Sequence, residues 1–314
     1  MSDNKGTEGP GTESLSSNDA RSSLSSDSAE EQGKREAAQY SAAKTPYTSI
    51  PPVTNAYKTG ASMRTFRICG ETKSQPLFCA SVHLGFSDRG PLGTRPGVYL
   101  HNGMSVEDPI LAAAGDEDRL SQRAYAFNNS SVVLVPRFSG EDDDGPGGDW
   151  VTELMVASTT GEGEGVVFHF AISAGRDQEC LRRERFEWRK FKKGIDAEYP
   201  GGGFKLFRLP RPTIRSDEDD TRHGDQRDQN DVTATDRGCV AVWESPTGFS
   251  KYWDHLYTLK FVGSDLSKDL GDRWQTVVVV TAARLWLIKV HGKTKKSTIR
   301  IREKMKGKFG STAQ

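Results

Sequence analysis

The chain has 314 residues, and its 43 Lys and Arg balance its 43 Asp and Glu, so the formal net charge is zero. This length allows one large domain or two small ones. A hydrophobic content of 34% is low for a globular protein, which argues against a chain that is folded from end to end.

Residues 1–62 are predicted to be a disordered, Ser-rich acidic tail. The first fifty residues contain eleven Ser and few bulky apolar side chains. Such a segment cannot bury enough surface to offset the entropy lost on ordering. Its Ser clusters, Ser22-Ser23 and Ser25-Ser26, are candidate phosphorylation sites. We expect ordered structure to begin near Met63.

From Met63 onward, eleven short apolar or alternating runs are separated by Gly, Pro and Asp. Most have the length and the Val, Phe, Trp and Tyr content of β-strands. The runs are 66–69, 77–83, 98–101, 110–114, 132–135, 151–157, 166–172, 185–191, 204–209, 240–243 and 256–262. Because no long helical pattern separates them, they predict an antiparallel barrel or sandwich and not a parallel sheet. A disordered acidic insert is predicted at about 213–237.

The pattern changes to helical spacing near the C-terminus. Apolar side chains recur three or four residues apart at Trp274, Val277, Val278, Thr281, Leu285 and Ile288. The stretch 276–290 is apolar nearly all round, which is typical of a buried helix, although its four consecutive Val would also suit a strand. Asp272 is expected to cap its start. At a rise of 1.5 Å per residue the stretch covers roughly 22 Å, so we expect no transmembrane segment.

The order of these segments resembles the tubby C-terminal-like superfamily, which includes LURP-one-related and scramblase-type domains, and in particular the uncharacterised fungal tubby-like proteins. The segments that carry the resemblance are PLFCASVH (76–83), GVYLHNG (97–103), DPILAAA (108–114), RRERFEWRKF (182–191), FKLFRL (204–209), VAVWES (240–245), LKFVG (259–263) and LGDRWQTVVVVTAARLW (270–286). The resemblance implies a mainly β domain over 63–290, a closed antiparallel barrel of about 11–12 strands around a central hydrophobic C-terminal helix.

Some members of that superfamily bind phosphoinositides through basic surface residues. Scramblase-type members carry clustered acylated cysteines and a terminal membrane segment. The four cysteines of this chain are far apart and no such segment follows the helix. The resemblance therefore implies binding at a membrane surface and argues against lipid transport.

Charge is distributed unevenly along the chain. Residues 1–50, 139–149 and 215–237 are acidic, and the remaining residues carry 34 bases and 22 acids, a surplus of +12. Residues 291–314 form a basic C-terminal tail. A basic folded body can concentrate anionic partners, among them anionic phospholipid head groups and nucleic acid.

Ten basic residues in two runs are the candidate anion-binding site. They are Arg182, Arg183, Arg185, Arg189, Lys190, Lys192 and Lys193 on a predicted strand, and Lys293, Lys295 and Lys296 after the helix. Arg side chains can bind phosphate oxygens through two parallel hydrogen bonds. Strand alternation places Arg185, Glu187 and Arg189 on one face and the aromatic residues between them on the other. The alternatives are a solvated face with Glu184 and Glu187 in cross-strand pairs, and a frayed terminus or nuclear-import signal for the second run.

No catalytic or metal-binding motif is found. The cysteines form no CxxC pair, the six His have no ligand spacing, and the acidic residues 141–144 lack the spacing of a calcium loop. The three glycines at 201–203 precede a strand and lack the GK[ST] of a phosphate-binding loop. We therefore expect no cofactor and no enzymatic activity, although a barrel can assemble a triad from distant strands.

These observations predict a non-enzymatic binding module for phosphoinositide or another polyanion. We expect it in the cytoplasm, with the nucleus and the membrane periphery as alternatives. A second hypothesis is a protein-interaction adaptor that uses the acidic tail and insert to bind protein partners. A third is a hydrolase with a site at a barrel mouth, which rests on the capacity of the fold alone.

Overall fold

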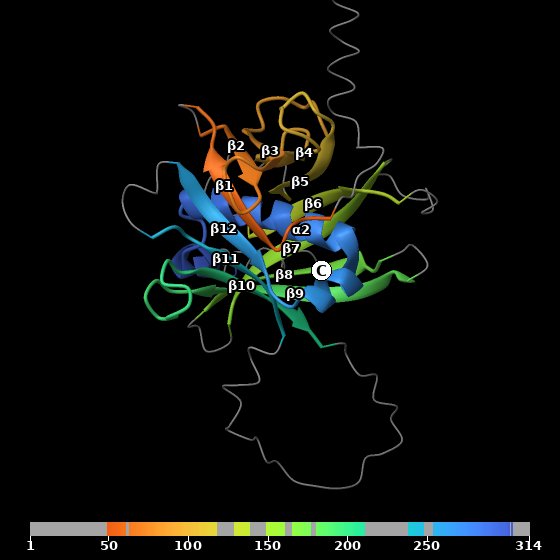
Figure 1. The fold of residues 1–314 in the computed structure, drawn as a ribbon. Helices are drawn as coiled ribbons and strands as arrows, with labels where there is room; N and C mark the ends of the chain where they lie inside the picture. The colour runs from red at the N-terminus through yellow and green to blue at the C-terminus, as the bar shows by residue number, and fades with distance from the viewer. Residues whose placement is uncertain are drawn as a thin grey trace, which may run out of the picture. The chain divides into compact units, whose positions relative to one another are not determined.

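The computed structural model describes residues 49–60, 63–117, 129–138, 149–160, 165–176, 180–210, 238–247, 254–301 and 303, with the backbone alone for 264–268. Within these ranges the chain forms twelve strands and one long helix (Figure 1). They are β1 (Val53–Lys58), β2 (Thr65–Cys69), β3 (Pro76–His83), β4 (Gly97–His101), β5 (Ile110–Asp116), β6 (Ser130–Pro136), β7 (Trp150–Thr159), β8 (Val166–Ala174), β9 (Arg182–Phe191), β10 (Gly203–Leu209), β11 (Cys239–Glu244), β12 (His255–Phe261) and α2 (Ser264–Val290).

The strands form a closed antiparallel barrel. Each strand pairs with the next one along the chain, and β1 pairs with β12 to close the ring. The predicted mainly β barrel is confirmed, and all eleven predicted runs are strands. Closure leaves no unpaired edge strand in the ring.

The barrel begins earlier in the chain than predicted. β1 lies within residues 1–62, which the sequence assigned to a disordered tail. Its buried residues are Thr54, Asn55 and Ala56, so it lacks the run of large apolar side chains that identified the other strands. Asn55 compensates with polar contacts, because its Nδ2 donates to the main-chain oxygens of Gly70 (3.0 Å) and Glu71 (3.1 Å). The other residues before 49, and the predicted insert at 213–237, lie outside the described residues.

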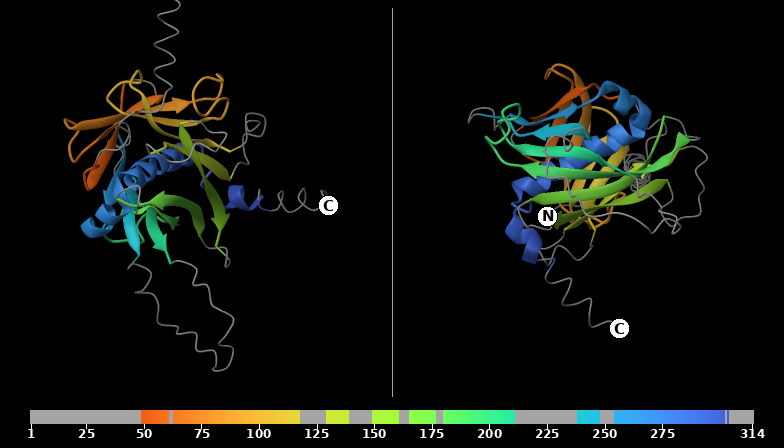
Figure 2. Two further views of the ribbon diagram at one scale, coloured as in Figure 1. Left: turned by 90° about the vertical axis from the view of Figure 1, so that its right-hand side faces the viewer. Right: turned by 90° about the horizontal axis from the view of Figure 1, so that it is seen from below.

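The helix α2 runs through the middle of the ring of strands, as both views in Figure 2 show. Every described residue from Thr276 to Ile288 is buried. Because strands surround it, each side of the helix meets apolar side chains, and this explains a sequence that is apolar nearly all round. Trp188 of β9 donates its indole N–H to the Thr281 hydroxyl at 3.2 Å. The prediction of a buried helix, and not a thirteenth strand, is confirmed.

The helix is longer than predicted and is kinked. It begins at Ser264, after Gly263, and Gly271 interrupts it with φ 77° and ψ 170°. Asp272 therefore follows the kink and does not cap the start of the helix. A Cβ at position 271 would lie 2.1 Å from the main-chain oxygen of Gly175 at the end of β8, so the close approach and the positive φ both require glycine.

The first residues of the predicted basic tail (291–314) pack on the barrel, so the alternative of a frayed terminus is wrong for them. Residues 296–301 form a helical turn, and Thr294 and Ile299 are buried. Asn129 Nδ2 donates to the Ile299 oxygen at 3.1 Å, and Figure 2 shows this turn beside the barrel strands. The basic composition concealed this docking, because it depends on a few buried side chains between the lysines.

Candidate functional site

The outer face of β9 carries three residues of the first predicted run, Arg183, Arg185 and Arg189. Phe186 and Trp188 are fully buried toward the helix, while Arg183 and Arg185 are exposed. The predicted alternation along this strand is therefore confirmed. Arg182 also lies exposed on β9, and Lys192 and Lys193 lie exposed in the turn that follows it.

Acidic side chains accompany several arginines of β9. Arg183 makes two hydrogen bonds to the Glu153 carboxylate, and these raise the pKa of Arg183. Arg189 Nε donates to Glu187 Oε1 at 2.5 Å. The predicted cross-strand pairs are present: Glu187 pairs with His169 of β8 on the outer face, whereas Glu184, which is buried on the side of Phe186, pairs with Arg208 of β10.

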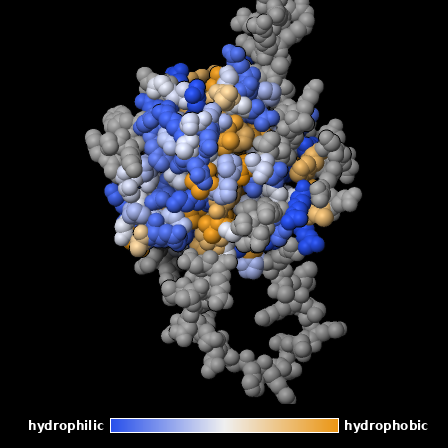
Figure 3. Space-filling view, viewed as in Figure 1, coloured by the Kyte–Doolittle hydropathy of each residue, from blue (hydrophilic) through white to orange (hydrophobic). Residues whose placement is uncertain are grey.

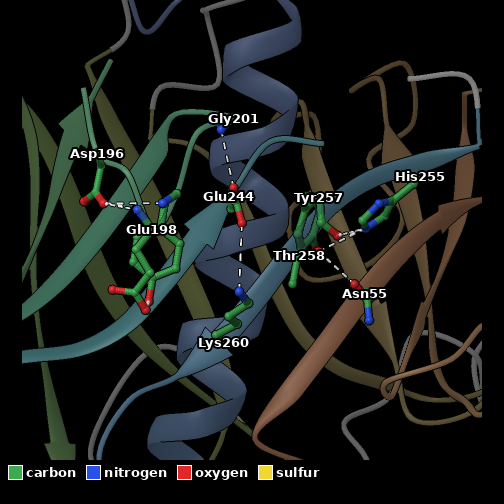
Figure 4. A network of polar contacts seen from close by, with 10 residues as sticks. Asn55, Asp196, Glu198, Gly201, Glu244, His255, Tyr257, Thr258 and Lys260 are labelled. Atoms are coloured by element: carbon green, nitrogen blue, oxygen red, sulfur yellow. Dashed lines mark hydrogen bonds and ion pairs between the residues drawn. The ribbon is translucent and has the colours of Figure 1, made fainter. Parts of the chain in front are cut away.

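The same pairing extends over the neighbouring outer surface. Glu244 lies between the N–H of Gly201 (3.4 Å) and the ammonium group of Lys260 (4.0 Å), as Figure 4 shows. In the same view Thr258 donates to Asn55 Oδ1 at 2.8 Å. Most of the described surface in Figure 3 is hydrophilic, with an apolar strip in the middle of the face. The outer surface of this part of the barrel is thus a solvated network of paired charges.

Lys190 differs from its neighbours on β9 because alternation turns it away from the outer face. It lies at the barrel end where β9 and β11 finish and where α2 ends. Its Nζ donates to the main-chain oxygen of Thr294 at 2.8 Å and lies 3.3 Å from the Thr294 hydroxyl. Burial, and then the positive charge of Lys295, lower the pKa of Lys190. The two basic runs of the sequence therefore meet at this point.

Lys289, in the last turn of α2, lies beside Lys190. Its ammonium group is 4.7 Å from the centroid of the Trp243 ring and donates to the hydroxyl of Ser245. Burial lowers the pKa of Lys289 to about 8, with a further contribution from the charge of Lys190. The folded protein therefore disfavours the charged form of Lys289 in the absence of a counter-ion.

Arg284, six residues before the end of α2, is buried with a carboxylate. Its guanidinium contacts the Asp116 carboxylate at the end of β5 and donates to the Ser131 hydroxyl at 3.1 Å. Lys293 lies 3.6 Å from the other oxygen of Asp116. Burial lowers the pKa of His291, and the charges of Lys293 and Arg284 lower it further. One carboxylate is thus shared between two cations.

We call Lys190, Arg284, Lys289, Lys293 and Lys295 the barrel-end cluster. Asp116 pairs with two of its members, while no carboxylate of the described residues forms an ion pair with the other three. Three of the ten predicted site residues belong to it, namely Lys190, Lys293 and Lys295. Lys296 follows them in the helical turn, half-buried, and the remaining six lie elsewhere on β9 or in the turn that follows it.

Sequence reasoning missed Lys289 and Arg284 as members of the site. The charge of Arg284 within an apolar helix was a signal in the sequence. Charged residues are rarely buried without a partner, so this position indicates a buried group of opposite charge. The identity of that partner was not readable, since Asp116 lies 168 positions from Arg284.

No group of three or more His, Cys, Asp or Glu that could hold a metal ion occurs among the residues that the structure describes. None of the described helices is long and apolar enough to cross a membrane. Comparisons of this chain with models of protein families, with curated proteins and with solved structures gave no match.

Proposed function

We propose that this protein is a binding module for polyanions, phosphoinositide head groups in particular, and that the barrel-end cluster is its binding site. One observation carries the proposal. Lys190 lies within electrostatic reach of both Lys289 and Lys295, and no carboxylate of the described residues is paired with any of the three.

The lysines of the barrel-end cluster lack a nearby negative charge that would favour their charged forms. Burial and mutual repulsion lower the pKa of both Lys190 and Lys289. A bound phosphate would supply the opposite charge, favour the charged form of each lysine and relieve the repulsion. Lysine binds phosphate as a point charge, and each basic residue near an anionic lipid surface contributes about 1 kcal/mol.

The proposal moves the binding site away from the outer face of β9. Arg183 and Arg189 are already paired with carboxylates, so a phosphate there would compete with an existing partner. The resemblance to the tubby C-terminal-like superfamily supports a lipid ligand. The alternative adaptor function depends on the acidic tail and insert, which lie outside the described residues apart from β1 and the residues beside it.

Vesicle flotation at physiological ionic strength tests the proposal. The full chain should float with phosphatidylcholine vesicles that contain a phosphoinositide and should remain unbound with phosphatidylcholine alone. Lys289→Gln, which keeps a donor for Ser245 but removes the charge, should reduce the recovered fraction. Equal recovery with both kinds of vesicle, or recovery that Lys289→Gln leaves unchanged, would contradict the proposal.

A further inference from the structure

Three polar side chains form a chain of hydrogen bonds across the outer face of three adjacent strands. Ser158 Oγ of β7 lies 2.9 Å from His169 Nε2 of β8, and His169 Nδ1 lies 2.9 Å from Glu187 Oε2 of β9. His169 and Glu187 are directly opposite each other in the β8–β9 ladder. Ser158 is opposite Val167, two residues from His169, so it reaches the imidazole along the diagonal.

The chemistry of the partners fixes which nitrogen carries the proton. A hydrogen bond from His169 lowers the pKa of Glu187, which is therefore an ionised carboxylate at neutral pH and can only accept. When the imidazole of His169 acts as a base, Nδ1 must therefore carry the hydrogen, and Nε2 is left to accept from the Ser158 hydroxyl. Arg189 Nε donates to the second oxygen of Glu187 at 2.5 Å and holds the carboxylate in place. A nucleophile, a base and a group that orients the base are thus arranged in the order that nucleophilic catalysis needs.

The arrangement is open to solvent. The His169 side chain is 42% exposed, whereas Glu187 is 13% exposed. Leu154 and Val156, on the same face of β7, are among the exposed large apolar residues, and Val156 is directly opposite His169. An apolar acyl group can therefore lie against β7 while its carbonyl carbon approaches Ser158.

A second Ser–His pair in the molecule lacks these properties. Ser81 Oγ lies 2.8 Å from His101 Nε2, but His101 Nδ1 faces the main-chain oxygen of Asp108 at 2.9 Å and not a carboxylate. His101 is 2% exposed, and burial lowers its pKa. This pair is inaccessible and its imidazole lacks a carboxylate partner, so it provides an internal control for the first.

We propose that Ser158 is a nucleophile toward activated carboxylic esters with a small apolar acyl group, with His169 as its general base and Glu187 as a positioning residue. Ser158 Oγ forms a bond to the carbonyl carbon while its proton passes to His169 Nε2. The bond to the leaving oxygen then breaks and His169 returns the proton to it, which leaves an acyl-Ser158. Water, deprotonated by His169, hydrolyses this intermediate to the acid and restores the serine.

The surroundings of Ser158 limit the rate and the substrate. The main-chain N–H and the hydroxyl of the next residue, Thr159, both donate to the Glu303 carboxylate at 2.9 Å. These donors are therefore not available to the oxyanion, and loss of one such donor costs about 100- to 1000-fold in rate. We expect slow turnover, and activated esters but not amides as substrates. The activity is independent of anion binding at the barrel-end cluster.

A fluorophosphonate probe tests the proposal on the full chain. Attack by Ser158 on phosphorus expels fluoride and leaves a stable phosphonyl-serine, which peptide mass spectrometry locates. The label should appear on Ser158, be absent from Ser158→Ala and form at least about 100-fold more slowly in His169→Ala. Ser81→Ala should label as fast as the unaltered chain.

The positioning role of Glu187 has its own readout. Glu187→Gln should slow labelling at least tenfold, and Glu187→Asp, which restores the carboxylate, should recover part of the rate. All these residues lie on the outer face, and a thermal melt checks that each variant is folded. Absence of label from Ser158, or equal labelling rates in folded His169→Ala and the unaltered chain, would overturn the proposal.

Discussion

Arg189 and Lys190 are adjacent in the sequence but lie in two different electrostatic environments. Arg189 is on the outer face of β9, where its guanidinium pairs with Glu187 and lies 4.3 Å from the Phe207 ring. Lys190 is at the barrel end, where its neighbours are Lys289 and Lys295. Most charged groups on the outer face are paired with a group of opposite charge, whereas the positively charged groups at the barrel end lie close to one another.

The comparison shows that a run of basic residues along a strand is not one surface. Side chains alternate between two sides of a sheet, so such a run is divided between two environments. What matters for anion binding is where positive charge lacks a partner.

Asp116→Asn should destabilise the protein by about 3–5 kcal/mol, because it leaves Arg284 buried without its counter-charge. The side chains of both Asp116 and Arg284 are 3% exposed. The free energy of unfolding from urea denaturation measures the effect.

Asp254→Asn is the matched control, since it makes the same change in an exposed pair. Asp254 lies 2.6 Å from Lys73, with side chains that are 57% and 59% exposed. Exposed pairs contribute about 0–1 kcal/mol. Similar losses of stability in the two variants would contradict the distinction between the barrel end and the outer face.

Anion affinity should weaken as the pH rises from 7 to 9. The pKa of Lys289 is about 8. Most Lys289 side chains are therefore charged at pH 7 and most are neutral at pH 9. The pKa of His291 is lowered, so His291 is neutral throughout. Loss of one cation should weaken binding about fivefold at about 1 kcal/mol per charge. Calorimetric titration with inositol hexakisphosphate at both pH values measures the change.

Lys289→Arg sharpens the pH prediction. A guanidinium stays charged at pH 9, so this variant should lose most of the pH dependence while it retains the site. A pH dependence as steep as that of the unaltered chain would assign the effect to another group.

Arg185→Gln should have the smallest effect. Arg185 is exposed on the outer face of β9, and surface substitutions of this kind change stability by no more than about 0.5 kcal/mol. Its affinity for inositol hexakisphosphate should also remain close to that of the unaltered chain. A large loss of affinity would indicate that the anion binds to the outer face of β9 and not to the barrel-end cluster.

The sequence predicted the barrel and its buried helix because both depend on local patterns. Val277 and its neighbours are apolar on every side of a helix, and Phe186 and Trp188 alternate with charges. The same patterns could not reveal β1, whose inward side chains are small or polar, as at Thr54. Ladder hydrogen bonds to β2 and β12 fix this strand, and those to β12 connect residues about 200 positions apart.

The candidate site was only partly predictable for a similar reason. The basic runs were visible, and alternation correctly separated Arg185 from Phe186. The proximity of Lys190 to Lys295 depends on the position at which α2 ends at the barrel. The line from Ser158 through His169 to Glu187 depends on the register of three strands, which no short motif encodes.

The most direct test compares two double variants that remove the same charge from the two regions. Lys190→Gln/Lys295→Gln should weaken the binding of inositol hexakisphosphate about 30-fold at fixed salt, from about 1 kcal/mol for each lysine. Arg183→Gln/Arg185→Gln, on the outer face of β9, should weaken it less than about threefold. Equal losses in the two variants, or a greater loss in the arginine variant, would contradict the assignment of anion binding to the barrel end.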